Sequence, residues 1–173
     1  NLAGSAFRQF NSTLFNGHPL QFELLGTPET ITSMTPEELR AFYREQVHLG
    51  EMTLAVVGDI SATSVQNLVM RYFDVTTPPP SRSELDMPLP PRERQEVISY
   101  RNRQQAHLVM GFMTVEMSAS DRWPLEVLAA ILSGQGGRLF LELRDRQSLA
   151  YSVSAFNLNL LDGGYFAAYI ATS

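Results

Sequence analysis

The sequence predicts an α+β fold in two parts, with antiparallel-rich sheets packed against helices and a proline-rich linker between the parts. The first part combines helical apolar spacing with one strand-like run, and the second places two helical segments between pairs of strand-like runs. Residues 75–95 carry runs of proline among mixed charges, which cannot pack as helix or sheet. These observations place the first part at 1–74, the linker at 75–95 and the second part at 96–173.

The first part is predicted to contain a helix near each end and a buried strand between them. Apolar residues recur near helical spacing over 2–15, and the Gly17 and Pro19 that follow predict the end of that helix. The continuous apolar run 52–57 predicts a buried strand. Ser61 then caps a further helix.

A third helix of this part is predicted to begin after Thr35. Thr35 can act as the N-cap, Pro36 fits the first helical position, and Glu38 can close a capping box. Its expected buried stripe consists of Leu39, Phe42, Tyr43 and Val47.

The second part is predicted to alternate strands and helices. Strand-like runs lie at 96–100, 106–115, 149–160 and 165–171. A helix is expected to begin at Ser120 or Asp121 and to be capped by Gly134, and a second to end near Arg146. The turn at 162–164 predicts that the last two strands form a hairpin.

Composition excludes several classes of function. The net charge of -5 and the interspersed charges provide no basic stripe for nucleic acid. All the basic residues are arginine, so a phosphate loop or a Schiff base that needs a lysine is excluded. Cysteine is absent, which excludes thiolate chemistry. No stretch approaches the roughly 20 apolar residues of a membrane span, so none is expected.

The chain is expected to be an internal piece of a longer protein. It starts at Asn1 without a methionine, and it ends at Ser173 within a strand-like run. Both ends therefore look like cuts in a longer polypeptide, and the sequence leaves the compartment undetermined.

The histidines do not form a metal site. His18, His48 and His107 are never four residues apart, so a helical zinc-peptidase motif is absent. His18 and His48 are interpreted as surface or capping residues. A nucleophile elbow is also missing, and a triad assembled from scattered residues could be proposed for almost any chain. No catalytic residue and no metal ligand is assigned within this chain.

The glycines Gly134, Gly136 and Gly137 have two interpretations. They lie between two predicted helices, and Leu139 stands where a dinucleotide-binding pattern needs its third glycine. They can serve as a tight turn between the helices. The alternative is a flexible loop near a substrate.

Arg144 and Tyr151 also have two interpretations. Arg144 ends a predicted helix and Tyr151 begins a predicted strand, and both side chains can donate to a peptide carbonyl or carboxylate. The alternative is structural, with Arg144 as a cation at a helix C-terminus and Tyr151 as an amphipathic residue at a sheet end.

Several segments together resemble the pitrilysin/insulinase family of zinc metallopeptidases, whose relatives include the subunits of the mitochondrial processing peptidase. The matching stretches are 14–19, 26–31, 34–39, 52–59, 131–134 and 138–153. They cover nearly the whole chain in the order of the family, so together they are more specific than any one of them.

The resemblance implies a fold of two facing lobes around a chamber. This chain would supply the C-terminal half of the first lobe, the linker, and the N-terminal half of a second lobe that binds no zinc. Arg144 and Tyr151 match an arginine and a tyrosine that bind the substrate backbone in active members. The implied partners are a peptide or protein substrate and the other lobe or a homologous subunit, with no nucleic acid.

The implied function is that of part of a zinc metalloendopeptidase, with the chain supplying chamber wall and substrate contacts. Zinc is expected in the parent protein and not in this chain, which by itself is expected to be inactive. The alternative is a non-catalytic binding or assembly subunit of the same family. An H-x-x-E-H helix upstream of Asn1 would favour the enzyme.

Overall fold

A computed structural model describes residues 1–47, 52–73, 90–91, 93–161 and 163–172. Contacts within the chain group Asn1–Leu25 with Asp86–Ser173 as a larger unit and Gly26–Leu85 as a smaller unit. The larger unit contains α1 (Leu2–Leu14), η1 (Pro19–Gln21), β1 (Ala106–Thr114), α5 (Arg122–Leu132), η3 (Phe140–Arg146), β2 (Ser152–Asn159) and β3 (Gly164–Thr172). The smaller unit contains α2 (Pro28–Ser33), α3 (Pro36–Gln46) and α4 (Ala62–Tyr72).

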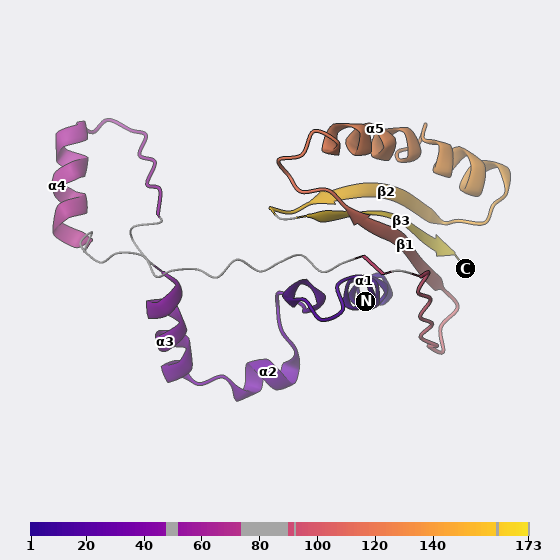
Figure 1. Cartoon of the computed structure of the whole chain (residues 1–173), viewed down its shortest axis with the longest axis horizontal. Helices are drawn as coiled ribbons and strands as arrows, with labels where there is room; N and C mark the ends of the chain where they lie inside the picture. Colours follow the sequence, from indigo (N-terminus) through magenta and orange to yellow (C-terminus); the bar gives the residue numbers. More distant parts are fainter. Residues whose placement is uncertain (48–51, 74–89, 92, 162, 173) are drawn as a thin grey trace. The chain divides into compact units, whose positions relative to one another are not determined.

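The larger unit is built on an antiparallel sheet of three strands in the order β1-β3-β2 (Figure 1). Ala168 of β3 faces Met110 of β1 on one side and Ala155 of β2 on the other. β2 and β3 are joined by a short turn in which the Leu160 N–H donates to the Gly163 carbonyl at 2.7 Å. The α+β fold class and the predicted hairpin are therefore confirmed.

α1 packs on one face of this sheet (Figure 1). The core of this layer is a cluster of apolar residues around Phe15 and Ala167, which are almost fully buried. The rings of Phe10 and Tyr165 meet edge to face, with centroids 5.2 Å apart. A glycine is needed beneath them, since a Cβ on Gly111 would lie 2.9 Å from Phe10 Cζ.

α5 packs on the opposite face of the sheet (Figure 1). Ala129 of the helix lies in one buried cluster with Ala155 of β2 and Phe166 of β3. The helix ends at Leu132, and Gly134 follows it with a φ of 78°. A positive φ is the conformation that glycine supplies at helix ends, so Gly134 has the predicted role of a cap.

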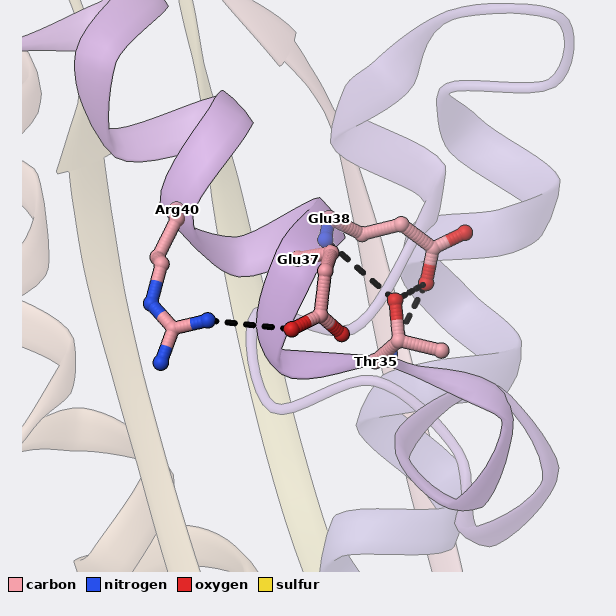
Figure 2. Close-up of polar contacts among 4 residues, drawn as sticks. All are labelled: Thr35, Glu37, Glu38 and Arg40. Atoms are coloured by element: carbon pink, nitrogen blue, oxygen red, sulfur yellow. Dashed lines mark hydrogen bonds and ion pairs between the residues drawn. The ribbon is translucent and has the colours of Figure 1, made fainter.

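The helices of the smaller unit begin at capping boxes. At the start of α3 the Thr35 N–H donates to Glu38 Oε2 at 2.8 Å, and the Glu38 N–H donates to Thr35 Oγ1 at 3.2 Å (Figure 2). These hydrogen bonds lower the pKa of Glu38, with the Thr35 backbone N–H as the main cause. Arg40 and Glu37 add an exposed ion pair of 3.0 Å. The predicted start of this helix is confirmed, but its predicted buried stripe is wrong, because Leu39, Phe42, Tyr43 and Val47 are all exposed.

Two predicted strands do not form. Residues 52–57 and 96–100 make no sheet ladder, and Val57, which was expected to be buried, is exposed. The prediction of a buried strand at 52–57 is therefore wrong for this chain. A strand needs a neighbour for its backbone hydrogen bonds. The three strands found in the described ranges pair only with one another, and neither segment is paired with any of them.

The contact units and the predicted division differ in where they place the first helix. α1 was predicted with residues 1–74, but it packs on the sheet formed by the second part. Most of the predicted linker, 75–95, lies outside the described residues, and the three-part division stays a prediction. No helix in the described ranges is long and apolar enough to cross a membrane.

Candidate substrate-binding site

The helix that carries Arg144 is wider than predicted. η3 is a π-helix, and the Gln147 N–H beyond its end donates to the Glu142 carbonyl, five residues earlier, at 3.2 Å. The predicted end near Arg146 is confirmed, but the regular α-helix expected there is not what forms. Such one-turn π segments inside helices occur frequently at functional sites.

The guanidinium of Arg144 lies over an aromatic ring. Its Cζ atom is 4.7 Å from the centroid of the Phe140 ring, one helical turn earlier, which is within the range of a cation–π contact. Arg144 is exposed and Phe140 is half-buried. Among the described residues Arg144 makes no ion pair, so its N–H donors remain available to a ligand.

The nearby carboxylate is occupied by other partners. Glu142 accepts from Gln147 Nε2 at 2.7 Å and from Arg146 Nη1 at 3.0 Å. The hydrogen bond from Gln147, followed by that from Arg146, lowers the pKa of Glu142. The carboxylate is therefore engaged by Arg146 and Gln147. Arg138, Leu141, Glu142 and Arg146 line a shallow hollow of about 370 Å³, which neither Arg144 nor Tyr151 lines.

A tight backbone turn connects Arg144 to Tyr151. The Leu143 carbonyl accepts from the N–H groups of Leu149 at 2.8 Å and Ala150 at 3.2 Å. Ser148, which lies between Arg144 and Tyr151 in the sequence, has a φ of 53°, which costs energy for a residue with a Cβ. The Tyr151 N–H donates to Ala171 at 2.8 Å, while its side chain is 73% exposed. The turn thus fixes the backbone on both sides, and both candidate side chains are exposed.

The glycine loop has a structural explanation at two of its three positions. Gly134 needs its positive φ, and Gly137 has no room for a side chain. The Ser133 hydroxyl, just before the loop, accepts from the Ala155 N–H at 2.6 Å and also donates to the Ala155 carbonyl. The interpretation as a tight turn therefore accounts for Gly134 and Gly137. A substrate contact of the loop stays a prediction.

Each histidine that the structure describes lies within hydrogen-bonding distance of a partner in the chain. His18 Nδ1 accepts from the Leu20 N–H at 3.2 Å, so it caps η1 as the sequence suggests. His107 Nδ1 lies 2.8 Å from the Tyr169 hydroxyl on the neighbouring strand. His48 lies outside the described residues.

The described residues do not fit a zinc site. Within the described ranges no three His, Cys, Asp or Glu side chains gather closely enough to hold a metal ion. A catalytic zinc needs three such protein ligands.

Two residues of this site were missed by sequence reasoning. Phe140 supports Arg144, and Glu142 pairs with Arg146, both four residues apart. Side chains at this spacing are neighbours on a helix, so the pattern could have been found in the sequence. The π-helical hydrogen bond and the positive φ of Ser148 have no comparable sequence signal.

Comparison with known families identifies the family to which this fold belongs. Residues 33–173 match the family described as the peptidase M16 inactive domain. The chain belongs to this family, and the resemblance to pitrilysin/insulinase-type metallopeptidases is confirmed.

Related proteins and structures agree with this assignment. The chain is 29% identical to an uncharacterized zinc protease of Streptomyces coelicolor over 92% of its own length and 36% of the relative. It is 31% identical to an uncharacterized zinc protease of Mycobacterium leprae, over 94% of the chain and 37% of the relative. The chain thus spans little more than a third of each of these relatives.

Solved structures share the fold at lower identity. A crystal structure of a peptidase M16 inactive domain from Pseudomonas fluorescens aligns with 99% of the chain and 42% of that protein, with a TM-score of 0.75 at 21% identity. A chain of complex III2 from Candida albicans aligns with 99% of this chain and 43% of its own length, with a TM-score of 0.78 at 13% identity. At these identities the likeness establishes the fold alone.

Proposed function

We propose that this chain is the part of a zinc metalloendopeptidase that binds substrate without holding the metal. The observation that carries the proposal is the match of residues 33–173 to the peptidase M16 inactive domain. The names of the relatives as zinc proteases support it. The chain would form part of the chamber wall and face a lobe or homologous subunit outside these residues.

The proposed division of labour leaves the chemistry of bond cleavage to the rest of the protein. A zinc ion bound there would activate a water for attack on the peptide carbonyl. The residues of this chain would hold the substrate backbone in a fixed position during that attack. Positioning of this kind contributes several kcal/mol to many enzymatic reactions.

Arg144 is the proposed donor to a substrate carbonyl beside the scissile bond. Its guanidinium carries a permanent charge and has no anionic partner among the described residues. A charge-assisted hydrogen bond to an oxygen that becomes more negative in the transition state favours the reaction. Tyr151, which is exposed at the far side of the turn, would add a second donor.

The backbone around these residues supports the proposal. Arg144 lies within the π-helix at 140–146 and four residues before Ser148 with its positive φ, and both are uncommon local conformations. Costly conformations gather at binding and catalytic sites, where they hold side chains in a required position. A helix that only needed a cation at its C-terminus would require neither.

The proposal is tested in the full-length parent protein. We expect Arg144→Ala to lower kcat/KM by about ten- to a thousandfold, and Tyr151→Phe by about tenfold, with zinc content and Tm near wild type. Arg122→Ala is the matched control, because Arg122 also lies over a ring, 4.1 Å from the centroid of Trp123, but outside the proposed site. An active enzyme in which both site variants keep full kcat/KM would refute the assignment.

The second candidate is a non-catalytic binding or assembly subunit. It is favoured by the description of the family as an inactive domain. The sequence upstream of Asn1 separates the two. An H-x-x-E-H helix there favours the enzyme, and a complete upstream lobe without it favours the subunit.

A further inference from the structure

We propose that Phe140 is a positioning residue, whose ring holds the Arg144 guanidinium ready for substrate. This inference rests on the proposed function of Arg144. Phe140 lies one helical turn before Arg144, and the Cζ atom of the arginine is 4.7 Å from the ring centroid. The face of an aromatic ring attracts a cation without using any of its N–H donors.

The Phe140 ring can order the Arg144 side chain without occupying its N–H donors, which a carboxylate could not do. An unpaired arginine on a surface explores many rotamers, and ordering it on binding costs free energy. A carboxylate could order it, but would then occupy the donors that a substrate carbonyl needs. The carboxylate of Glu142, two residues before Arg144, is instead bonded to Arg146 and Gln147. Phe140 therefore orders the side chain and leaves its donors free.

The half-buried position of Phe140 makes it a fixed support. Its helix is tied to the following strand because the Leu143 carbonyl accepts from both Leu149 and Ala150. Leu139, next to Phe140, packs against the cluster that contains Ala129 and Phe166. The ring thus belongs to a well-anchored segment, while the guanidinium above it is exposed.

The test is a double-mutant cycle in the full-length zinc-loaded parent protein. Phe140→Leu removes the ring and keeps an apolar side chain, and Phe140→Tyr keeps an aromatic face. We expect Phe140→Leu to lower kcat/KM about three- to tenfold, as loss of an ordinary cation–π contact predicts, and Phe140→Tyr to restore most of it. In the Arg144→Ala background, Phe140→Leu is expected to have no further effect. Phe140→Met serves if the leucine variant does not fold.

A spectroscopic measurement reports the contact independently of activity. In protein labelled at arginine, the side-chain protons of Arg144 are expected to show an upfield ring-current shift, which Phe140→Leu abolishes and Phe140→Tyr retains. Trp123→Leu removes the comparable contact with Arg122, 4.1 Å from that ring, and is expected to leave kcat/KM unchanged.

The outcomes separate this inference from the proposed function. If Arg144→Ala keeps full activity, the substrate role of Arg144 fails and the inference fails with it. If Arg144→Ala is impaired but Phe140→Leu has no effect, the substrate role stands and the positioning role is overturned. The same holds if Phe140→Leu lowers kcat/KM equally with and without Arg144, since the ring would then act on its own.

Discussion

Replacing Gly137 by alanine is expected to destabilise the larger unit, whereas the same change at Gly136 is not. A Cβ on Gly137 would collide with the Ser133 carbonyl and would lie 2.6 Å from the Leu132 carbonyl oxygen. These are backbone atoms and cannot rotate away. A Cβ on Gly136 would meet nothing within 4 Å, and its φ lies outside the left-handed region.

The magnitude follows from these two environments. Overpacking against fixed atoms costs about 1–3 kcal/mol. A glycine replaced at an unstrained position stabilises by about 0.4–1 kcal/mol, because the unfolded chain loses freedom. The two alanine variants are therefore expected to differ by about 1.4–4 kcal/mol in free energy of unfolding. Moving Ser133 would also disturb its hydrogen bond of 2.6 Å from the Ala155 N–H.

The assay is urea unfolding of the full-length protein together with hydrogen exchange of the peptide that contains Ala155. Gly137→Ala is expected to unfold at lower urea and to exchange faster in β2, while Gly136→Ala matches or exceeds wild type. Equal stability of the two variants would show that the loop is not the packed turn described above. If Gly136→Ala instead keeps stability and loses kcat/KM, the interpretation as a flexible loop near substrate gains support.

Two further predictions concern hydrogen bonds away from the site. Tyr169→Phe removes the hydroxyl that lies 2.8 Å from His107 Nδ1 and leaves this half-buried nitrogen unpaired. The loss is expected to lower the free energy of unfolding, measured in urea, by about 1–3 kcal/mol. Tyr72→Phe, at an exposed position, is the control and should leave stability unchanged. For Glu38 the folded-state pKa is lowered from 4.5, so its contribution to stability is present above that value and is lost as the pH falls through the folded-state pKa. Glu38→Gln keeps an acceptor for the capping box but cannot titrate. The stability of α3, measured by hydrogen exchange, should therefore fall less as the pH is lowered in the variant than in the wild type. An equal loss of stability at low pH in both proteins would contradict this reasoning.

The sequence predicted the elements that depend on contacts between residues close together in the chain. The cap at Thr35, the hairpin between β2 and β3, and the glycine at the end of α5 depend on residues within a few positions of one another. The family resemblance was equally accessible, because it rests on short segments in a fixed order. Arg144 and Tyr151 were proposed on that basis, and their role stays a prediction.

Elements that depend on distant partners were not predictable in the same way. The segment 52–57 has the apolar character of a buried strand, but a strand forms only where a neighbour supplies hydrogen bonds. The packing of α1 on β1 and β3 joins residues such as Phe15 and Tyr165, which are far apart in the sequence. The π-helix at 140–146 arises from a hydrogen-bond shift that side-chain periodicity does not encode.

The hydroxyl of Ser133 makes the two outer edges of the sheet different. It bonds to both the N–H and the carbonyl of Ala155, so the outer rim of β2 is already occupied at its middle. The outer rim of β1 has no strand beside it among the described residues. An additional strand, from the same polypeptide or another, would find its backbone partners at β1. The side chain of Ser133, just after α5, thus occupies the edge of β2 at Ala155.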